Sequence, residues 1–232
     1  MTIKKHHQKN VNNAAAKTVK AKAIILRGID MNNAKLAYLD FTGAEMVDCN
    51  LEDATLTETV LKSVNLGYSC LNDADLQGCD LREANLQNSI LCGVVLNGAN
   101  LSDADFSHAD LTGAILDRPY KMLNSDEEVK ARLRKAVFKK ANLRGAKMTT
   151  LDLRTIDFSG SDLTGADFSG ANLQSANFTN ANLTGAKFNN ADLTGIAIKG
   201  ATIRNTEFDG AILDDINHSD FADAVGAGKL AA

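Results

Sequence analysis

The sequence contains no tryptophan, a single proline (Pro119) and few aromatic residues, which make up 5% of its 232 residues. No apolar run approaches the roughly 20 residues that a membrane-spanning helix needs. The N-terminus also lacks the apolar stretch of a secretory signal. We therefore expect a soluble, cytoplasmic protein without a transmembrane segment.

Motifs for catalysis, cofactor binding and metal binding are absent as well. No nucleotide-binding or nucleophile-elbow fingerprint is found, and the spacings of the four cysteines match no zinc pattern. Cys49 and Cys79 fit a role as small buried hydrophobic residues. The sequence therefore predicts no catalytic residue, no metal site, no cofactor and no small-molecule substrate, so the protein is not expected to be an enzyme. The four histidines are scattered: His6, His7, His108 and His218.

What the sequence has instead is a five-residue repeat. Residues 161–195 read SDLTG, ADFSG, ANLQS, ANFTN, ANLTG, AKFNN and ADLTG without a gap. We number each unit from its central Leu or Phe, position i, with a small residue at i−2, usually Asp or Asn at i−1, and polar residues or Gly at i+1 and i+2. A five-residue step would smear the apolar side chains around an α-helix, and in one flat strand it would alternate their faces. The pattern instead predicts a short extended wall followed by a corner, with i and i−2 inside.

The spacing of the phenylalanines indicates how many walls form one coil. A phenylalanine recurs at every second unit, at Phe158, Phe168, Phe178 and Phe188. Four walls to a coil place Phe158 under Phe178 and Phe168 under Phe188, whereas three walls would scatter them. Repeating coils of this kind stack into a solenoid.

These units resemble the pentapeptide-repeat family, whose motif is roughly a small residue, Asp or Asn, Leu or Phe, a polar residue, and Gly or another residue. The resemblance implies an all-β solenoid, a right-handed quadrilateral β-helix. Counting 34 units at four to a coil gives about 8–9 coils. Fold alone does not fix the function, because the roles known for the family are few and diverse.

The repeats divide the chain into five segments. We expect a basic flexible arm at 1–22, a first array at 23–118, an inserted loop and helix at 119–135, a second array at 136–215, and a C-terminal cap or tail at 216–232. Within the insertion, SDEE at 125–128 reads as a capping box. Val129 and Leu133 then share one face of a short helix at about 126–135. A hinge between two rods is the alternative that the sequence leaves open.

Charge is distributed unevenly along the chain. Residues 30–117 contain 15 acidic and 3 basic residues, whereas residues 118–147 contain 10 basic and 3 acidic residues. Some proteins of the family are acidic rods that mimic DNA and bind gyrase, and the charge density of the first array is similar to that of duplex DNA. A candidate acidic binding surface within one coil comprises Asp73, Asp75, Asp80 and Glu83.

Two further surfaces are candidates for binding. A basic belt comprises Arg132, Arg134, Lys135, Lys139, Lys140, Arg144 and Lys147, which suit an anionic partner. An apolar patch comprises Ile90, Cys92, Val95 and Ile115, where Asp or Asn is usual at most of these positions; it suggests a protein contact such as a homodimer, or packing under the inserted helix.

The sequence thus favours a non-enzymatic scaffold that binds a protein partner of unknown identity. One alternative is a DNA mimic that binds a type II topoisomerase, as in quinolone resistance. A second alternative is binding of anions or nucleic acid through the basic arm and belt.

Overall fold

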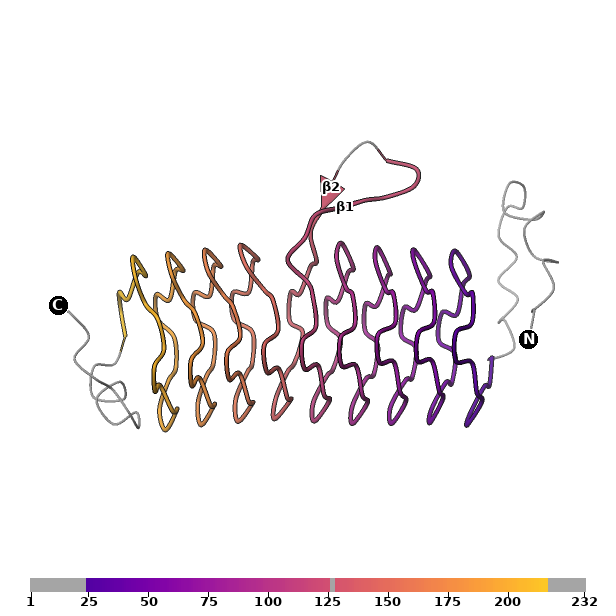
Figure 1. Cartoon of the computed structure of the whole chain (residues 1–232), viewed down its shortest axis with the longest axis horizontal. Coiled ribbons are helices and arrows are strands. Elements are labelled where there is room, and N and C mark those ends of the chain that lie inside the picture. The colour runs from indigo at the N-terminus through magenta and orange to yellow at the C-terminus, as the bar shows by residue number, and fades with distance from the viewer. Residues whose placement is uncertain (1–23, 126–127, 217–232) are drawn as a thin grey trace.

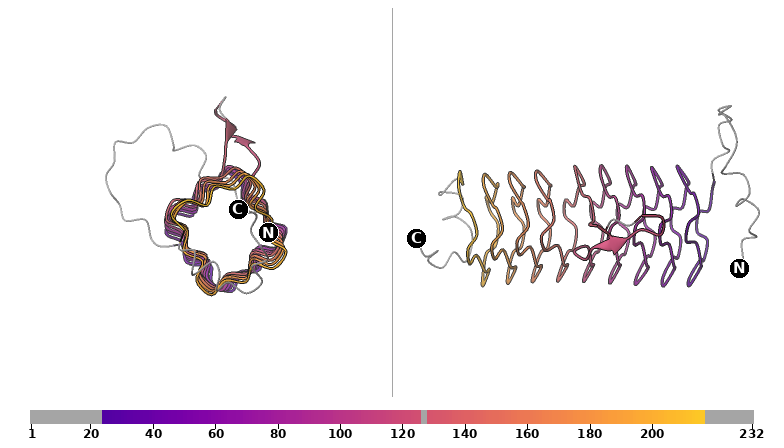
Figure 2. Two further views of the ribbon diagram at one scale, coloured as in Figure 1. Left: turned by 90° about the vertical axis from the view of Figure 1, so that its left-hand side faces the viewer. Right: turned by 90° about the horizontal axis from the view of Figure 1, so that it is seen from above.

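The computed structural model describes residues 24–125 and 128–216, which form one rod of stacked coils (Figure 1). Seen down its axis, the rod has a four-sided outline (Figure 2). The described residues contain no helix that could cross a membrane. The expected basic arm lies outside the described residues, as does the expected C-terminal tail apart from Ile216, which is buried.

Each wall is one five-residue unit whose backbone bonds to both neighbouring coils. In the unit 161–165, the N–H of Asp162 donates to the carbonyl of Ala141 in the preceding coil (3.0 Å), and the N–H of Leu163 donates to that of Asn182 in the next coil (2.8 Å). The N–H of Ala166 then donates to the carbonyl of Leu163 (3.0 Å) and closes the corner. Because buried backbone groups must be paired, this pattern repeats along the rod. It is interrupted between residues 131–135 and 151–155, which no bridge or backbone hydrogen bond joins among the described residues.

The corner explains why Asp or Asn and Gly recur in the units. The Asp162 carboxylate accepts the N–H of Thr164 (3.0 Å), which fixes the start of the turn. Except at Arg118, where the chain leaves the rod, the last residue of each described corner takes a positive φ, for example 67° at Gly165 and 58° at Asn180. Glycine adopts this region freely, and Asn and Asp tolerate it better than other residues do.

Backbone bridges between equivalent residues of successive coils, such as Asn142 and Asp162, stack the i−1 positions into one ladder on each side of the rod. We name the four sides by these ladders. Wall 1 runs from Ile25 to Ala197, wall 2 from Asp30 to Thr202 and wall 3 from Lys35 to Glu207; wall 4 has two runs of bridges, from Asp40 to Arg132 and from Asp152 to Ile212.

The expected inserted helix is wrong. Asn100 pairs with Arg132, where the regular step would end at Tyr120, so residues 119–130 are the segment added to the repeat. Strands β1 (Tyr120–Lys121) and β2 (Glu128–Val129) pair antiparallel there, and no described residue of 128–135 is helical. Leu133 is 1% exposed in the rod core. A wall buries this side chain fully, whereas a short surface helix gains too little burial to be stable.

The core is a filled column of the side chains at i and i−2. As predicted, Phe158 stacks on Phe178 (ring centroids 5.2 Å apart, 8° between planes) and Phe168 stacks on Phe188 (5.0 Å, 5°). The stack on wall 1 also includes Phe138, on the other side of Phe158. Rings of the two columns meet edge to face, as aromatic pairs prefer.

Cys49 and Cys79 point inward as the register predicts, with 2% and 1% exposure. Each thiol donates to a backbone carbonyl, that of Leu26 and that of Leu56 respectively. Burial raises the pKa of the Cys79 thiol, so it stays protonated and unreactive.

We expect Phe178→Ala to lower the free energy of unfolding by about 3–5 kcal/mol, because it leaves a cavity in a stacked column. The half-buried Phe208, at the end of the other column, provides the matched control, and Phe208→Ala should cost clearly less. Chemical denaturation measures both. A loss at Phe178 no larger than that at Phe208 would contradict the packed column.

We also expect deletion of 119–130 to leave a folded rod, because it joins Arg118 to Ala131 and restores the regular step from each coil to the next. Deletion of 119–135 removes one wall in addition. Every later unit would then shift by one wall, and Phe138 would leave its stack on Phe106. Circular dichroism and thermal melting compare the two. Equal melting temperatures would show that register across the insertion does not matter.

Candidate interaction surface

The structure departs from its repeat where the chain leaves the rod. It leaves after Arg118, at the corner between walls 3 and 4, and re-enters at Ala131. The hairpin formed by β1 and β2 projects from this corner and extends over the first array, toward the N-terminal coils (Figures 1 and 2).

The hairpin is docked on the corner residues of earlier coils. The hydroxyl of Tyr120 donates to the carboxylate of Glu58 (3.1 Å), which also accepts the N–H of Leu123 (2.5 Å). Burial and this carboxylate raise the pKa of Tyr120, so the phenol stays a hydrogen-bond donor. Tyr120 crosses Gly78 and Gly98, where an added Cβ would lie 2.7 Å from its side chain. The two glycines thus form the seat of the hairpin.

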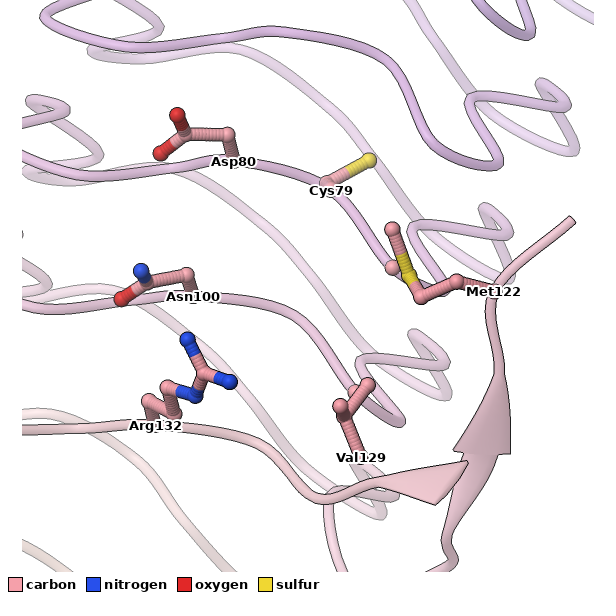
Figure 3. A pocket seen from close by; sticks show the side chains of 8 residues that line it. Cys79, Asp80, Asn100, Met122, Val129 and Arg132 are labelled. Carbon is pink, nitrogen blue, oxygen red and sulfur yellow. The ribbon is translucent and has the colours of Figure 1, made fainter. Parts of the chain in front are cut away.

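A shallow groove of about 200 Å³ separates the hairpin from wall 4 (Figure 3). Met122 and Val129 line it from the hairpin side, and Asp80, Asn100 and Arg132 line it from the wall. The Asp80 carboxylate is bonded to the Arg82 guanidinium (2.7 and 2.5 Å), which lowers the pKa of Asp80. The groove is thus lined by two apolar side chains, Met122 and Val129, on the hairpin side and by the cation of Arg132 on the wall side.

The first unit after the hairpin carries three exposed cations, Arg132, Arg134 and Lys135. We call residues 131–135 the cationic unit. On the same wall, the equivalent arginines of other units bond an aspartate of their own unit, Arg82 to Asp80 (2.5 Å) and Arg154 to Asp152 (2.7 Å). In the cationic unit an arginine occupies that aspartate position. None of its three cations forms an ion pair with another described residue.

The other members of the basic belt continue around the same coil. Lys139 and Lys140 belong to wall 1, Arg144 to wall 2 and Lys147 to wall 3, and all are exposed. Arg144 bonds Asp162 of the next coil (3.2 Å). The belt therefore encircles the rod, and only its part on wall 4 lies beside the hairpin.

Comparison with known proteins agrees with this geometry. A family model for pentapeptide repeats, with 8 copies, matches residues 22–53, 48–78, 79–118, 129–160, 156–195 and 176–215. The chain belongs to the pentapeptide repeat family. A search of curated proteins found no match to the sequence.

Two solved pentapeptide repeat structures are similar to this chain. HetL, involved in the regulation of heterocyst differentiation in the cyanobacterium Nostoc sp. strain PCC 7120, is 26% identical with a TM-score of 0.62, over 82% of this chain and 86% of HetL. QnrB1, a plasmid-mediated fluoroquinolone resistance protein, is 17% identical with a TM-score of 0.41, over 87% of this chain and 94% of that chain.

The pentapeptide register distributes the candidate acidic surface around the rod. Asp73 lies at the corner after wall 2, Asp75 on wall 3, Asp80 on wall 4, and Glu83 at the corner after wall 4. Glu83 accepts the Ser63 hydroxyl (2.9 Å) and lies 3.5 Å from the Lys62 ammonium. A single flat partner surface therefore cannot contact all four carboxylates.

The apolar patch lies on two adjoining pentapeptide walls. Ile90 is on wall 2 and 45% exposed, and Cys92 follows it toward the corner. We call each bridged i−1 residue of a ladder a rung; Val95 and Ile115 are successive rungs of wall 3. The contacts of the hairpin are with wall 4 and with the corner that holds Glu58, Gly78 and Gly98. None of the four patch residues lines the groove under the hairpin or forms a hydrogen bond to it among the described residues.

We expect Gly98→Ala to undock the hairpin, because the added methyl group meets Tyr120. Gly113 provides a matched control: its φ of 70° is close to the 71° of Gly98, but an added Cβ would meet no atom within 4 Å. Both substitutions carry backbone strain of about 1 kcal/mol. Limited proteolysis should cut the hairpin faster only in Gly98→Ala. Equal cleavage of the two variants would contradict the docked hairpin.

Proposed function

We propose that this pentapeptide repeat protein is a non-enzymatic interaction scaffold that binds an acidic protein surface through the hairpin and the cationic unit. The observation that carries this proposal is the set of three exposed cations at 132, 134 and 135, which lie on wall 4 beside the hairpin and form no ion pair among the described residues.

A binding role suits a rod whose interior is filled. The side chains at i and i−2 leave no large enclosed pocket, of the kind that substrates occupy, among the described residues. In the same part of the chain no cluster of His, Cys, Asp and Glu is arranged to hold a metal ion. The side chains that are available for binding therefore lie on the outer surface of the rod.

The cationic unit is suited to recognition because its backbone is hydrogen-bonded to the preceding coil. Arg132 is bridged to Asn100, so this part of the backbone loses little conformational freedom when a partner binds. Cations that lack an internal partner attract an acidic surface and speed its encounter. The adjacent Met122 and Val129 add apolar contact at the groove. A binding role is also consistent with the involvement of HetL in the regulation of heterocyst differentiation.

A DNA mimic is the second candidate, and the acidic excess of residues 30–117 favours it. Its partner would be a type II topoisomerase. The scattered placement of the four candidate carboxylates, and the bond that holds Asp80 to Arg82, weigh against a continuous acidic face.

The test uses affinity capture with quantitative mass spectrometry, followed by titration of the partner identified. The variant Arg132→Glu, Arg134→Glu, Lys135→Glu should lose the partner by at least about tenfold, since each charge reversal turns attraction into repulsion. The matched control Lys187→Glu, Lys199→Glu, Arg204→Glu changes three exposed cations away from the hairpin and should retain binding.

The acidic variant, with Asp73, Asp75, Asp80 and Glu83 all changed to Lys, separates the two candidates. Loss of the partner here, with binding retained by the cationic-unit variant, would replace the scaffold proposal by the DNA mimic. Inhibition of gyrase supercoiling by the wild-type protein alone would then be expected. Thermal melting of each variant confirms that the rod stays folded.

A further inference from the structure

Wall 3 carries four consecutive rungs that read acid, apolar, apolar, base: Asp75, Val95, Ile115 and Lys147. Neighbouring rungs are joined by parallel bridges, so the four side chains form one straight column on the outside of the rod. All four are at least partly exposed. Two apolar rungs stand where the repeat usually places Asp or Asn.

This order is complementary to itself when reversed. We propose that wall 3 pairs with wall 3 of a second copy in the antiparallel direction, around a two-fold axis between Val95 and Ile115. Val95 then faces Ile115 of the second copy, and Asp75 faces Lys147 of the second copy. Both contacts occur twice, as a two-fold interface requires. The apolar pairs lie at the centre and the ion pairs flank them.

The two charges are available for this contact. Within the described ranges, the Asp75 carboxylate accepts hydrogen bonds only from uncharged donors, the Thr57 hydroxyl (3.0 Å) and the N–H of Gln77 (3.0 Å). Neither Asp75 nor Lys147 takes part in an ion pair among the residues that the structure describes. Each can therefore gain a charged partner without breaking an internal one.

Wall 4 has a related order, Asp80, Asn100 and Arg132, but it is less suited to pairing with a second copy. The hairpin covers this ladder from one side, its middle rung is polar, and Arg82 already holds Asp80. The hairpin lines a groove on wall 4 and is seated on Glu58, Gly78 and Gly98, at the corner between walls 3 and 4. Of the two ladders, wall 3 is therefore better suited to pairing with a second copy.

The size of the contact indicates weak association. Six rungs, from Thr55 to Asp167, extend for roughly 29 Å at about 4.8 Å a rung, and one wall is roughly 13 Å wide. About 400 Å² per copy is half of a standard interface, which places the pair in the weak class. One rung further out, Lys35 would face Lys187 of the second copy, which keeps the interface from growing tighter.

The test is sedimentation velocity at protein concentrations up to about 500 µM, where interfaces of this class become populated. Wild-type protein should dimerise reversibly. Asp75→Lys and Lys147→Asp should each weaken the dimer by about tenfold or more, because each places like charges opposite one another. An equimolar mixture of the two variants should dimerise again, since each then meets the opposite charge.

The mixing step keeps the proposal falsifiable even if one substitution destabilises the rod, and circular dichroism reports on that separately. Asp157→Lys on wall 1 is the control and should dimerise like wild type. A monomeric wild type, or a mixture no more associated than its components, would overturn the proposal. The readout needs no other protein, so it is independent of the acidic partner proposed above.

Discussion

The backbone hydrogen bonds that join each coil to the next are the constraint on which the rest of this structure depends. A coil is held by N–H and carbonyl groups of the coils on either side, so one residue out of step would leave a whole wall unpaired. The same bonds align the phenylalanine columns and the outer ladders. They also limit where extra chain can be added: the inserted segment 119–130 leaves and re-enters at one corner, and the following coil resumes in phase.

Because the coils are in register, a single unusual residue at i−1 changes the outer surface at a defined place on one ladder. A residue at i−1 always lies above and below residues of the same position, so an apolar or charged rung has fixed neighbours. The cationic unit forms no ion pair within the described part of the chain, because Arg132 occupies the position at which Asp80 and Asp152 each bond an arginine of their own unit. The seat of the hairpin arises in the same way, since Gly78 and Gly98 are successive corners on one edge. The regular repeat thereby carries a local binding site on its surface, and the core positions i and i−2 are unchanged.

The sequence predicted the coil length, the stacked phenylalanines and the inward cysteines because these follow from spacing alone. It misled at residues 125–135, where SDEE imitates a capping box and Val129 and Leu133 have helical spacing. Leu133 is flanked by two arginines, which hides its place as a repeat centre. The docking of Tyr120 on Glu58 joins residues 62 apart and depends on the folded corner, so no local pattern could reveal it. The glycines at equivalent corners of two successive coils were the one available signal of a close approach.

The two surfaces can operate together because they occupy different sides of the rod. The two-fold axis proposed for wall 3 runs across the rod in the plane of that wall, so it leaves each corner on its own side of the pair. Both hairpins then lie along one edge, at the corner between walls 3 and 4, and extend in opposite directions along the rod. A partner with two acidic sites could engage both cationic units at once. The second contact would be intramolecular, and its high effective concentration would raise the overall affinity even though the dimer is weak.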